Sequence, residues 1–156
     1  KVKANINAGE AYLYGFSGGL NADISKSVSI QSTLSYTFGR IETDSSDYPL
    51  DHIPPVTGKT SLNISIQQFK GSVYFLYHGF KKLKDYNLTG EDNIDNATPF
   101  GTPNWTTFNI SGNYTINKHI SIQAAVENIM DIHYRVFASG ISAPGRNFIL
   151  SLRGNF

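Results

Sequence analysis

The sequence predicts an all-β fold, an antiparallel transmembrane β-barrel of which this chain supplies about seven strands. Three observations lead to this prediction. Apolar and polar residues alternate with a period of two along most of the chain, as in strands with one apolar face. The connections between these segments alternate strictly between short and long. The aromatic residues fall near the ends of the apolar faces, whereas a soluble core favours them in mid-strand.

The alternating segments and expected strands are residues 12–24, 28–38, 60–66, 72–80, 105–116, 120–126 and 146–156. In the second of them, Val28 and Ile30 share one face, while Ser29 and Gln31 share the other. Its length is near the roughly 9–11 residues that a tilted strand needs to cross a bilayer. Segment 72–80 is apolar on both faces, so its facing stays open. Residues 1–5 form only a short opening piece.

The expected connections fall into two classes, as in membrane barrels with short turns at one end and long loops at the other. The short ones are residues 25–27, 67–71 and 117–118, and the long ones are 39–58, 81–104 and 128–145. Aromatic residues near the long-loop ends are expected to form a girdle at the membrane interface. They are Tyr12, Tyr14, Phe16, Tyr36, Phe38, Trp105, Phe108 and Phe148. Tyr114 and Phe156 lie near the short-turn ends.

Composition narrows the functional classes. Charged residues are 16 % of the chain and the net charge is +1, which gives no electrostatic basis for binding nucleic acid. The chain has no Cys, so disulfides and thiolate metal sites are excluded. No window is apolar enough for a membrane-spanning helix. The first residues contain no apolar run of a signal peptide, so we expect Lys1 to lie inside a longer precursor.

The last expected strand, residues 146–156, ends on an aromatic residue. Its apolar face carries Phe148, Leu150, Leu152 and Phe156. This pattern resembles the closing strand of bacterial outer-membrane barrels, where it is the recognition signal for the insertion machinery. We therefore expect these four side chains to face lipid and to direct insertion. A soluble antiparallel sheet with one wet face is the alternative for this strand alone.

The connecting segments carry further short motifs. They are Asn-Ala-Gly-Glu-Ala at 7–11, Ile-Pro-Pro at 53–55, Gly-Thr-Pro-Asn-Trp at 101–105, Glu-Asn-Ile-Met-Asp at 127–131, Tyr134, Ser-Gly-Ile at 139–141 and Pro-Gly-Arg-Asn-Phe at 144–148. Together, and in this order, they resemble the carboxyl-terminal end of TonB-dependent outer-membrane receptors. The resemblance covers essentially the whole chain.

This resemblance implies that residues 1–156 are the carboxyl-terminal segment of a barrel of about 22 strands. The plug domain and the TonB box of the family would lie in a missing amino-terminal part. The implied function is an outer-membrane receptor that imports a scarce nutrient, such as an iron–siderophore chelate, with energy supplied through TonB. The implied partners are TonB, outer-membrane lipids and lipopolysaccharide, the barrel-insertion machinery and the small-molecule chelate. The implied location is the outer membrane of a Gram-negative bacterium.

Candidate ligand-binding residues lie in the long loops, where a receptor first meets its ligand. They form one polar cluster of Asp44, Asp47, Tyr48 and His52, a second of Glu91, Asp92 and Asp95, and the pair His133 and Arg135. The pair suits an anionic ligand or a lipopolysaccharide phosphate, with packing between loops as the alternative. The acidic stretch that contains Glu91, Asp92 and Asp95 lacks the spacing and the glycine of a calcium loop, so the sequence predicts no metal site there. It predicts no cofactor either.

Two other functional classes remain open. A complete eight-stranded barrel with a structural or adhesion role is the first, because residues 1–5 plus the seven expected strands reach eight, the minimum for a filled barrel. A membrane-embedded hydrolase is the second, because a catalytic triad needs no sequence motif. The chain contains neither a nucleophile-elbow motif nor a zinc-protease motif, so we predict that it is not an enzyme.

Overall fold

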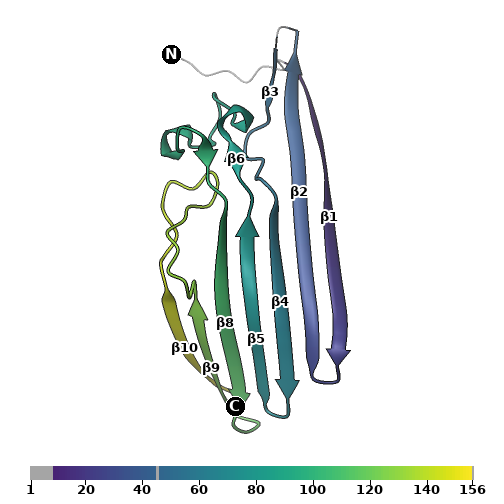
Figure 1. Ribbon diagram of the computed structural model, residues 1–156, viewed down its shortest axis with the longest axis vertical. Helices are drawn as coiled ribbons and strands as arrows, with labels where there is room; N and C mark the ends of the chain where they lie inside the picture. The colour runs from purple at the N-terminus through teal and green to yellow at the C-terminus, as the bar shows by residue number, and fades with distance from the viewer. Residues whose placement is uncertain (1–8, 45, 156) are drawn as a thin grey trace.

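The computed structural model describes residues 9–44 and 46–155, and these form an antiparallel sheet with irregular loops at one end (Figure 1). The strands of the main sheet are β1 (Glu10–Ser25), β2 (Val28–Thr43), β3 (Ser46–Pro49), β4 (Thr57–Ile66), β5 (Phe69–His78), β8 (Trp105–Thr115), β9 (Ile120–Glu127) and β10 (Asn147–Gly154). Their order is β1-β2-β4-β5-β8-β9-β10, with β3 paired to β2. The predicted all-β antiparallel fold is therefore confirmed. Phe156 lies outside the described residues.

The strand register gathers the apolar residues on one face of the sheet. One row crosses every long strand and consists of Ala22, Ile30, Leu62, Val73, Ile110, Val126 and Phe148. The next row, on the opposite face, consists of Asp23, Ser29, Asn63, Ser72, Ser111, Ala125 and Ile149. We call these the apolar face and the polar face. The register also settles the open facing of β5, because Val73 belongs to the apolar face and Tyr74 to the polar face.

The short and long connections lie at opposite ends of the sheet, as predicted (Figure 1). Each short turn follows a strand that points toward the short-turn end of the sheet. The chain's last strand, β10, points toward the same end. At the turn before β9, the side-chain oxygen of Asn117 accepts hydrogen bonds from the backbone N–H groups of His119 (2.8 Å) and Ile120 (3.0 Å). Asn therefore shapes the turn through its side chain.

Several strand boundaries differ from those predicted. β2 runs on to Thr43 because β1 pairs with it as far as Glu10–Glu42, and β3 then folds back along it. Much of the expected loop 39–58 is therefore a hairpin. β5 begins at Phe69, which shortens the turn expected at 67–71. The expected loop 81–104 contains a small sheet of β6 (Lys81–Lys82) and β7 (Gly101–Thr102) and two 3₁₀ turns, η1 (Leu83–Asp85) and η2 (Ile94–Asn96).

Most of the predicted aromatic girdle shares the apolar face near the long-loop end. Ring centroids of Tyr14 and Phe38 are 5.0 Å apart, and those of Phe16 and Tyr36 are 5.9 Å apart. Tyr12 lies 6.3 Å from Phe38, and Phe108 lies 5.9 Å from Phe75.

Trp105 does not belong to this face, so that part of the prediction is wrong. Trp105 and Phe108 are three positions apart, and an odd difference in position along a regular strand puts the two side chains on opposite faces. Trp105 pairs across the sheet with His78 on the polar face. Its ring stacks on the His78 ring at 5.2 Å and lies 4.2 Å from the ring of Tyr134.

The apolar face is exposed to the surroundings over much of its area. On β10, Phe148 is 73 % exposed, Leu150 79 % and Leu152 74 %. Large continuous apolar surfaces on a folded chain mark contact with a membrane or with another protein surface. Within the described residues, no helix has the length and apolar character to cross a membrane.

Gly58 allows an aromatic side chain to lie flat on the apolar face. A Cβ at this position would come within 2.2 Å of the Tyr77 ring. With only hydrogen there, Tyr77 covers the glycine of the paired strand and donates a hydrogen bond to the Thr33 carbonyl at 3.3 Å. An aromatic ring thus covers backbone that glycine would otherwise leave bare.

Candidate functional site

The three long loops join into a single structure at one end of the sheet, which we call the loop cap. It consists of residues 46–56, 79–104 and 128–146, the first, second and third loops (Figure 1). The cap buries three large hydrophobic side chains, one from each loop: Ile53, Tyr86 and Phe137. The rings of Tyr86 and Phe137 meet edge to face at 5.2 Å, a favourable aromatic geometry. The cap therefore has a small core of its own.

Lys81 connects all three loops through this core. It lies in β6 at the start of the second loop and is only 7 % exposed. Its ammonium group donates a 2.6 Å hydrogen bond to the Ile53 carbonyl of the first loop. The same group lies 4.9 Å from the ring centre of Phe137 in the third loop, within the range of a cation–π contact. Burial lowers the pKa of Lys81, and the nearby Asp92 and Asp85 oppose that shift.

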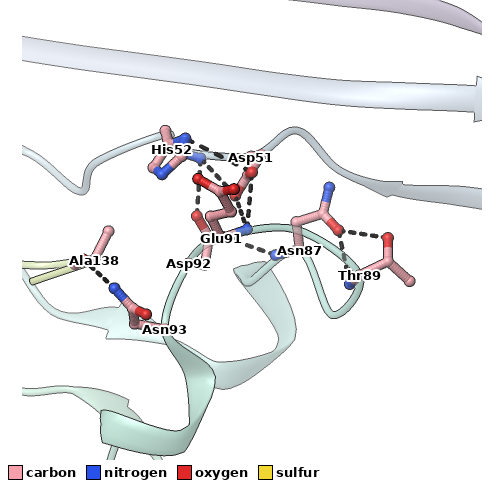
Figure 2. Close-up of polar contacts among 8 residues, drawn as sticks. All are labelled: Asp51, His52, Asn87, Thr89, Glu91, Asp92, Asn93 and Ala138. Carbon is pink, nitrogen blue, oxygen red and sulfur yellow. Dashed lines mark hydrogen bonds and ion pairs between the residues drawn. The ribbon is translucent and has the colours of Figure 1, made fainter. Parts of the chain in front are cut away.

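Two carboxylates fasten the first loop to the second in a reciprocal way, which we call the carboxylate clasp (Figure 2). The N–H of Glu91 donates to both carboxylate oxygens of Asp51, at 3.0 and 2.9 Å. In return, the N–H of His52 donates to the Asp92 carboxylate at 2.8 Å. The other Asp92 oxygen accepts the N–H of Asn87, also at 2.8 Å. Each loop thus supplies one acid and one backbone donor to the other.

The backbone around the clasp is shaped to present these groups. His52 and Asn93 have φ angles of 58° and 55°, the left-handed region that few non-glycine residues adopt. The side-chain oxygen of Asn87 accepts hydrogen bonds from the N–H and the hydroxyl of Thr89, both at 3.0 Å, and so forms a local turn ahead of Asp92. Asn93 then donates to the Ala138 carbonyl, which ties the third loop to the same point (Figure 2).

The two clasp carboxyls have opposite pKa shifts. Burial raises the pKa of Asp92, and the hydrogen bonds from Asn87 and His52 only partly offset it. Burial alone would also raise the pKa of Asp51. Hydrogen bonds from Glu91 and from the Asp92 carboxyl outweigh this effect and lower the pKa of Asp51. Of the two carboxyls, Asp92 therefore takes up a proton more readily than Asp51.

A cavity of about 250 Å³ lies between the second and third loops. Its lining includes Trp105, His133, Tyr134 and Arg135. Arg135 donates a 3.0 Å hydrogen bond to the Asn96 carbonyl of the second loop. The guanidinium therefore connects the two loops and borders the cavity at the same time.

The structure regroups the predicted ligand residues. His52 and Asp92, expected in separate clusters, are joined in the clasp. Asp47 and Tyr48 lie in β3, where Asp47 pairs with Arg40 at 2.6 Å, and Asp44 precedes that strand. Asp92 is 1 % exposed, because both its oxygens accept backbone N–H groups between the loops. Ligand contact by the predicted residues stays a prediction.

Sequence reasoning missed Asp51, Lys81, Tyr86 and Phe137, which hold the cap together. Loop residues have no periodicity that would mark a buried position. The only available signal was that Asp51 directly precedes His52, a residue already singled out. In residues 9–44 and 46–155, no three His, Asp or Glu side chains lie close enough together to hold a metal ion.

The sequence matches the family described as "TonB dependent receptor-like, beta-barrel" over residues 3–129. The chain belongs to this family. No curated protein matches the sequence. The resemblance stated from the loop motifs is therefore confirmed.

Solved structures agree on the fold of this TonB-dependent receptor segment. The copper transporter OprC aligns with a TM-score of 0.79 at 18 % identity, over 95 % of this chain and 24 % of its own. The ferric enterobactin receptor PfeA of Pseudomonas aeruginosa aligns with a TM-score of 0.68 at 20 % identity, over 94 % and 23 %. The ferric yersiniabactin uptake receptor FyuA of Yersinia pestis aligns with a TM-score of 0.67 at 16 % identity, over 96 % and 24 %. The chain thus spans about a quarter of the length of these proteins.

Proposed function

We propose that this chain is the carboxyl-terminal wall segment and part of the outer loops of a receptor that imports a scarce metal chelate across the outer membrane of a Gram-negative bacterium. The observation that carries the proposal is the continuous apolar row across the long strands, combined with membership of the receptor family. A lipid-facing wall with all long loops at one end is what a barrel receptor needs.

Iron–siderophore or similar chelates are the proposed cargo. The similar solved structures are a copper transporter and receptors for ferric enterobactin and ferric yersiniabactin. On this chain we place chelate contacts in the loop cap, with His133 and Arg135 beside the cavity between the second and third loops. The exposed acids Asp44, Asp47, Glu91 and Asp95, with Tyr48 and His52, surround the same end of the sheet.

The proposed partners act on different parts of the receptor. TonB would act through a plug and TonB box outside residues 1–156. Lipid and lipopolysaccharide would contact the apolar face and its aromatic girdle. The insertion machinery would recognise the last strand through Phe148, Leu150, Leu152 and Phe156. The chemistry of the receptor is binding and release, so we propose that the protein is not an enzyme.

Uptake in cells tests this proposal. A strain lacking the gene for the full-length protein is compared with its parent, each with and without TonB, for uptake of radiolabelled iron as ferric enterobactin or ferric citrate and of copper. We expect one of these cargoes to lose its uptake equally in the strain without the receptor and in the strain without TonB. Unchanged uptake of all three, or uptake that does not need TonB, would overturn the proposal.

The alternative of a complete eight-stranded barrel finds less support. Within the described residues, β1 pairs only with β2 and β10 only with β9, so each outer strand has a free edge. Free edges of this length favour pairing with further strands. The short opening piece on which that alternative depends, residues 1–5, lies outside the described residues.

A further inference from the structure

We propose that the carboxylate clasp is a proton-operated latch, which fastens the first two long loops to each other most tightly when Asp51 and Asp92 share a single proton. The latch is a property of the loop cap and does not depend on which cargo the receptor carries. It assigns a role to Asp51 and Asp92 that goes beyond transport itself.

The geometry of the clasp is the first step of the argument. Asp51 and Asp92 each accept an N–H from the other's loop, and the N–H of His52 donates to both carboxylates, at 2.8 Å to Asp92 and 3.1 Å to Asp51, so the two carboxyl groups lie side by side. Two acids in such contact cannot both ionise without strong repulsion. Adding one proton replaces that repulsion with a hydrogen bond between a carboxyl and a carboxylate, which is short and strong.

The groups around the clasp do not remove this need for a proton. The ring of His52 lies 3.6 Å from Asp51, on the more exposed side of the pair. Lys81 and Tyr86 act on Asp92 from the second loop, but the ammonium of Lys81 is bonded to the Ile53 carbonyl and the Tyr86 hydroxyl to Thr102. Glu91 faces Asp51 through its backbone N–H. Asp85 is the remaining charged group near Lys81.

The direction of the pH effect follows from the two shifts. The pKa of Asp92 is raised, so its stabilising proton is present in acid and is lost as pH rises through that raised pKa. The pKa of Asp51 is lowered, so its contribution is present above the ordinary carboxyl range and is lost as pH falls through that lowered pKa. The latch is therefore tightest between the lowered pKa of Asp51 and the raised pKa of Asp92.

A released latch would affect the whole cap. The first loop would keep its Ile53–Lys81 bond but would lose both backbone bonds to the second loop. The third loop is attached to the second through Asn93 and Arg135, so it would stay with the second loop. Opening would therefore loosen the first loop against the other two, with the Ile53–Lys81 bond still holding it, and would leave the strands unchanged.

Hydrogen exchange of the full-length protein in detergent or nanodiscs tests the latch. Peptides that contain the N–H groups of His52, Asn87 and Glu91 are followed at about pH 5 and about pH 8, after correction for intrinsic exchange. We expect greater protection at the lower pH, because the proton that Asp92 holds there stabilises the closed latch. Equal protection at the two pH values, or greater protection at the higher one, would overturn the proposal.

Variants assign the effect to the clasp. Asp92→Asn keeps an oxygen acceptor but cannot titrate, so the pH dependence should disappear. Asp51→Asn removes the partner charge and should reduce the dependence in the same peptides, even if the Asp92 variant fails to fold. Asp95→Asn, an exposed acid in η2 of the same loop, is the matched control and should behave as the wild type. Persistence of the full dependence in either clasp variant would contradict the latch.

Discussion

The strand wall and the loop cap are built on opposite principles. The wall exposes its apolar side chains and is held by backbone pairing between neighbouring strands, with Leu150 79 % exposed on β10. The cap buries one large apolar side chain from each loop, Ile53, Tyr86 and Phe137, and its loops are joined by side chains that bond to distant backbone groups. In the wall, the surroundings must supply the apolar contact. In the cap, the chain supplies it.

The two regions also differ in how their contacts are specified. Wall contacts are backbone pairs whose register repeats along whole strands, whether a tight turn or a long loop connects the two strands. The cap contacts of Asp92 with His52 and of Arg135 with Asn96 are single hydrogen bonds between residues 40 and 39 positions apart. Damage to the wall should therefore affect folding and insertion, whereas damage to the cap should stay local.

The largest effect is expected from Leu150→Arg in the wall. A cationic side chain facing mid-bilayer lipid costs about 2–4 kcal/mol. The fraction of folded, heat-modifiable barrel in outer membranes measures the loss. Ser151→Arg is the control, because Ser151 lies on the polar face of the same strand, opposite Gln123. Equal folded fractions for both variants would show that β10 does not place Leu150 against lipid.

A smaller and local effect is expected from Asp92→Ala in the cap. Its removal leaves the buried N–H of Asn87 without an acceptor and leaves the N–H of His52 with only its longer bond to Asp51, at a cost of about 2 kcal/mol. We expect faster cleavage of the first and second loops in limited proteolysis, with an unchanged folded fraction of the barrel. Asp95→Ala is the exposed control. A fall in the folded fraction would mean that cap and wall are not separable in this way.

The wall was predictable from sequence because period-two alternation shows directly which face of the sheet each residue occupies. Alternation in residues 28–38 and 105–116 placed Ile30 and Ile110 on one face, and the register puts both in the same apolar row. Segment 72–80 was not predictable alone, since Val73 and Tyr74 are both apolar. The face to which each of its residues belongs followed only from the register with the neighbouring strands. Trp105 was misplaced because its position near a strand end was weighed above its odd spacing from Phe108.

The cap was not predictable, because nothing local distinguishes a buried loop acid from an exposed one. Asp92 and Asp95 look alike in the sequence, yet one is buried in the clasp and the other is exposed. Likewise Phe137 packs in the cap core, while Phe100 is 77 % exposed. Burial in the cap depends on which loops meet, and that is decided by strand order and not by loop composition.

An intermediate effect is expected at Asn109, where wall and cap meet. Asn109 lies on the polar face of β8 and is 3 % exposed. Its side-chain oxygen accepts the N–H of Asn128, the first residue of the third loop, at 2.9 Å. Asn109→Ala should cost about 1 kcal/mol by leaving that N–H without a partner. We expect faster hydrogen exchange near Asn128.

Asn113→Ala, on the same face of the same strand, is the control for this joint, because Asn113 faces Lys70 and Gln123 far from the third loop. It should leave exchange near Asn128 unchanged. Faster exchange in both variants would point to a general weakening of β8 and would contradict a specific joint.

The smallest effect is expected from Tyr77→Phe in the wall. The change keeps the ring over Gly58 but removes the hydroxyl that donates to the Thr33 carbonyl. A 3.3 Å hydrogen bond contributes about 0.5 kcal/mol, so the midpoint of urea unfolding in lipid should fall only slightly. Gly58→Ala should cost more, because its Cβ displaces the ring itself. If Tyr77→Phe proved as costly as Gly58→Ala, the hydroxyl and not the ring packing would stabilise this part of the wall.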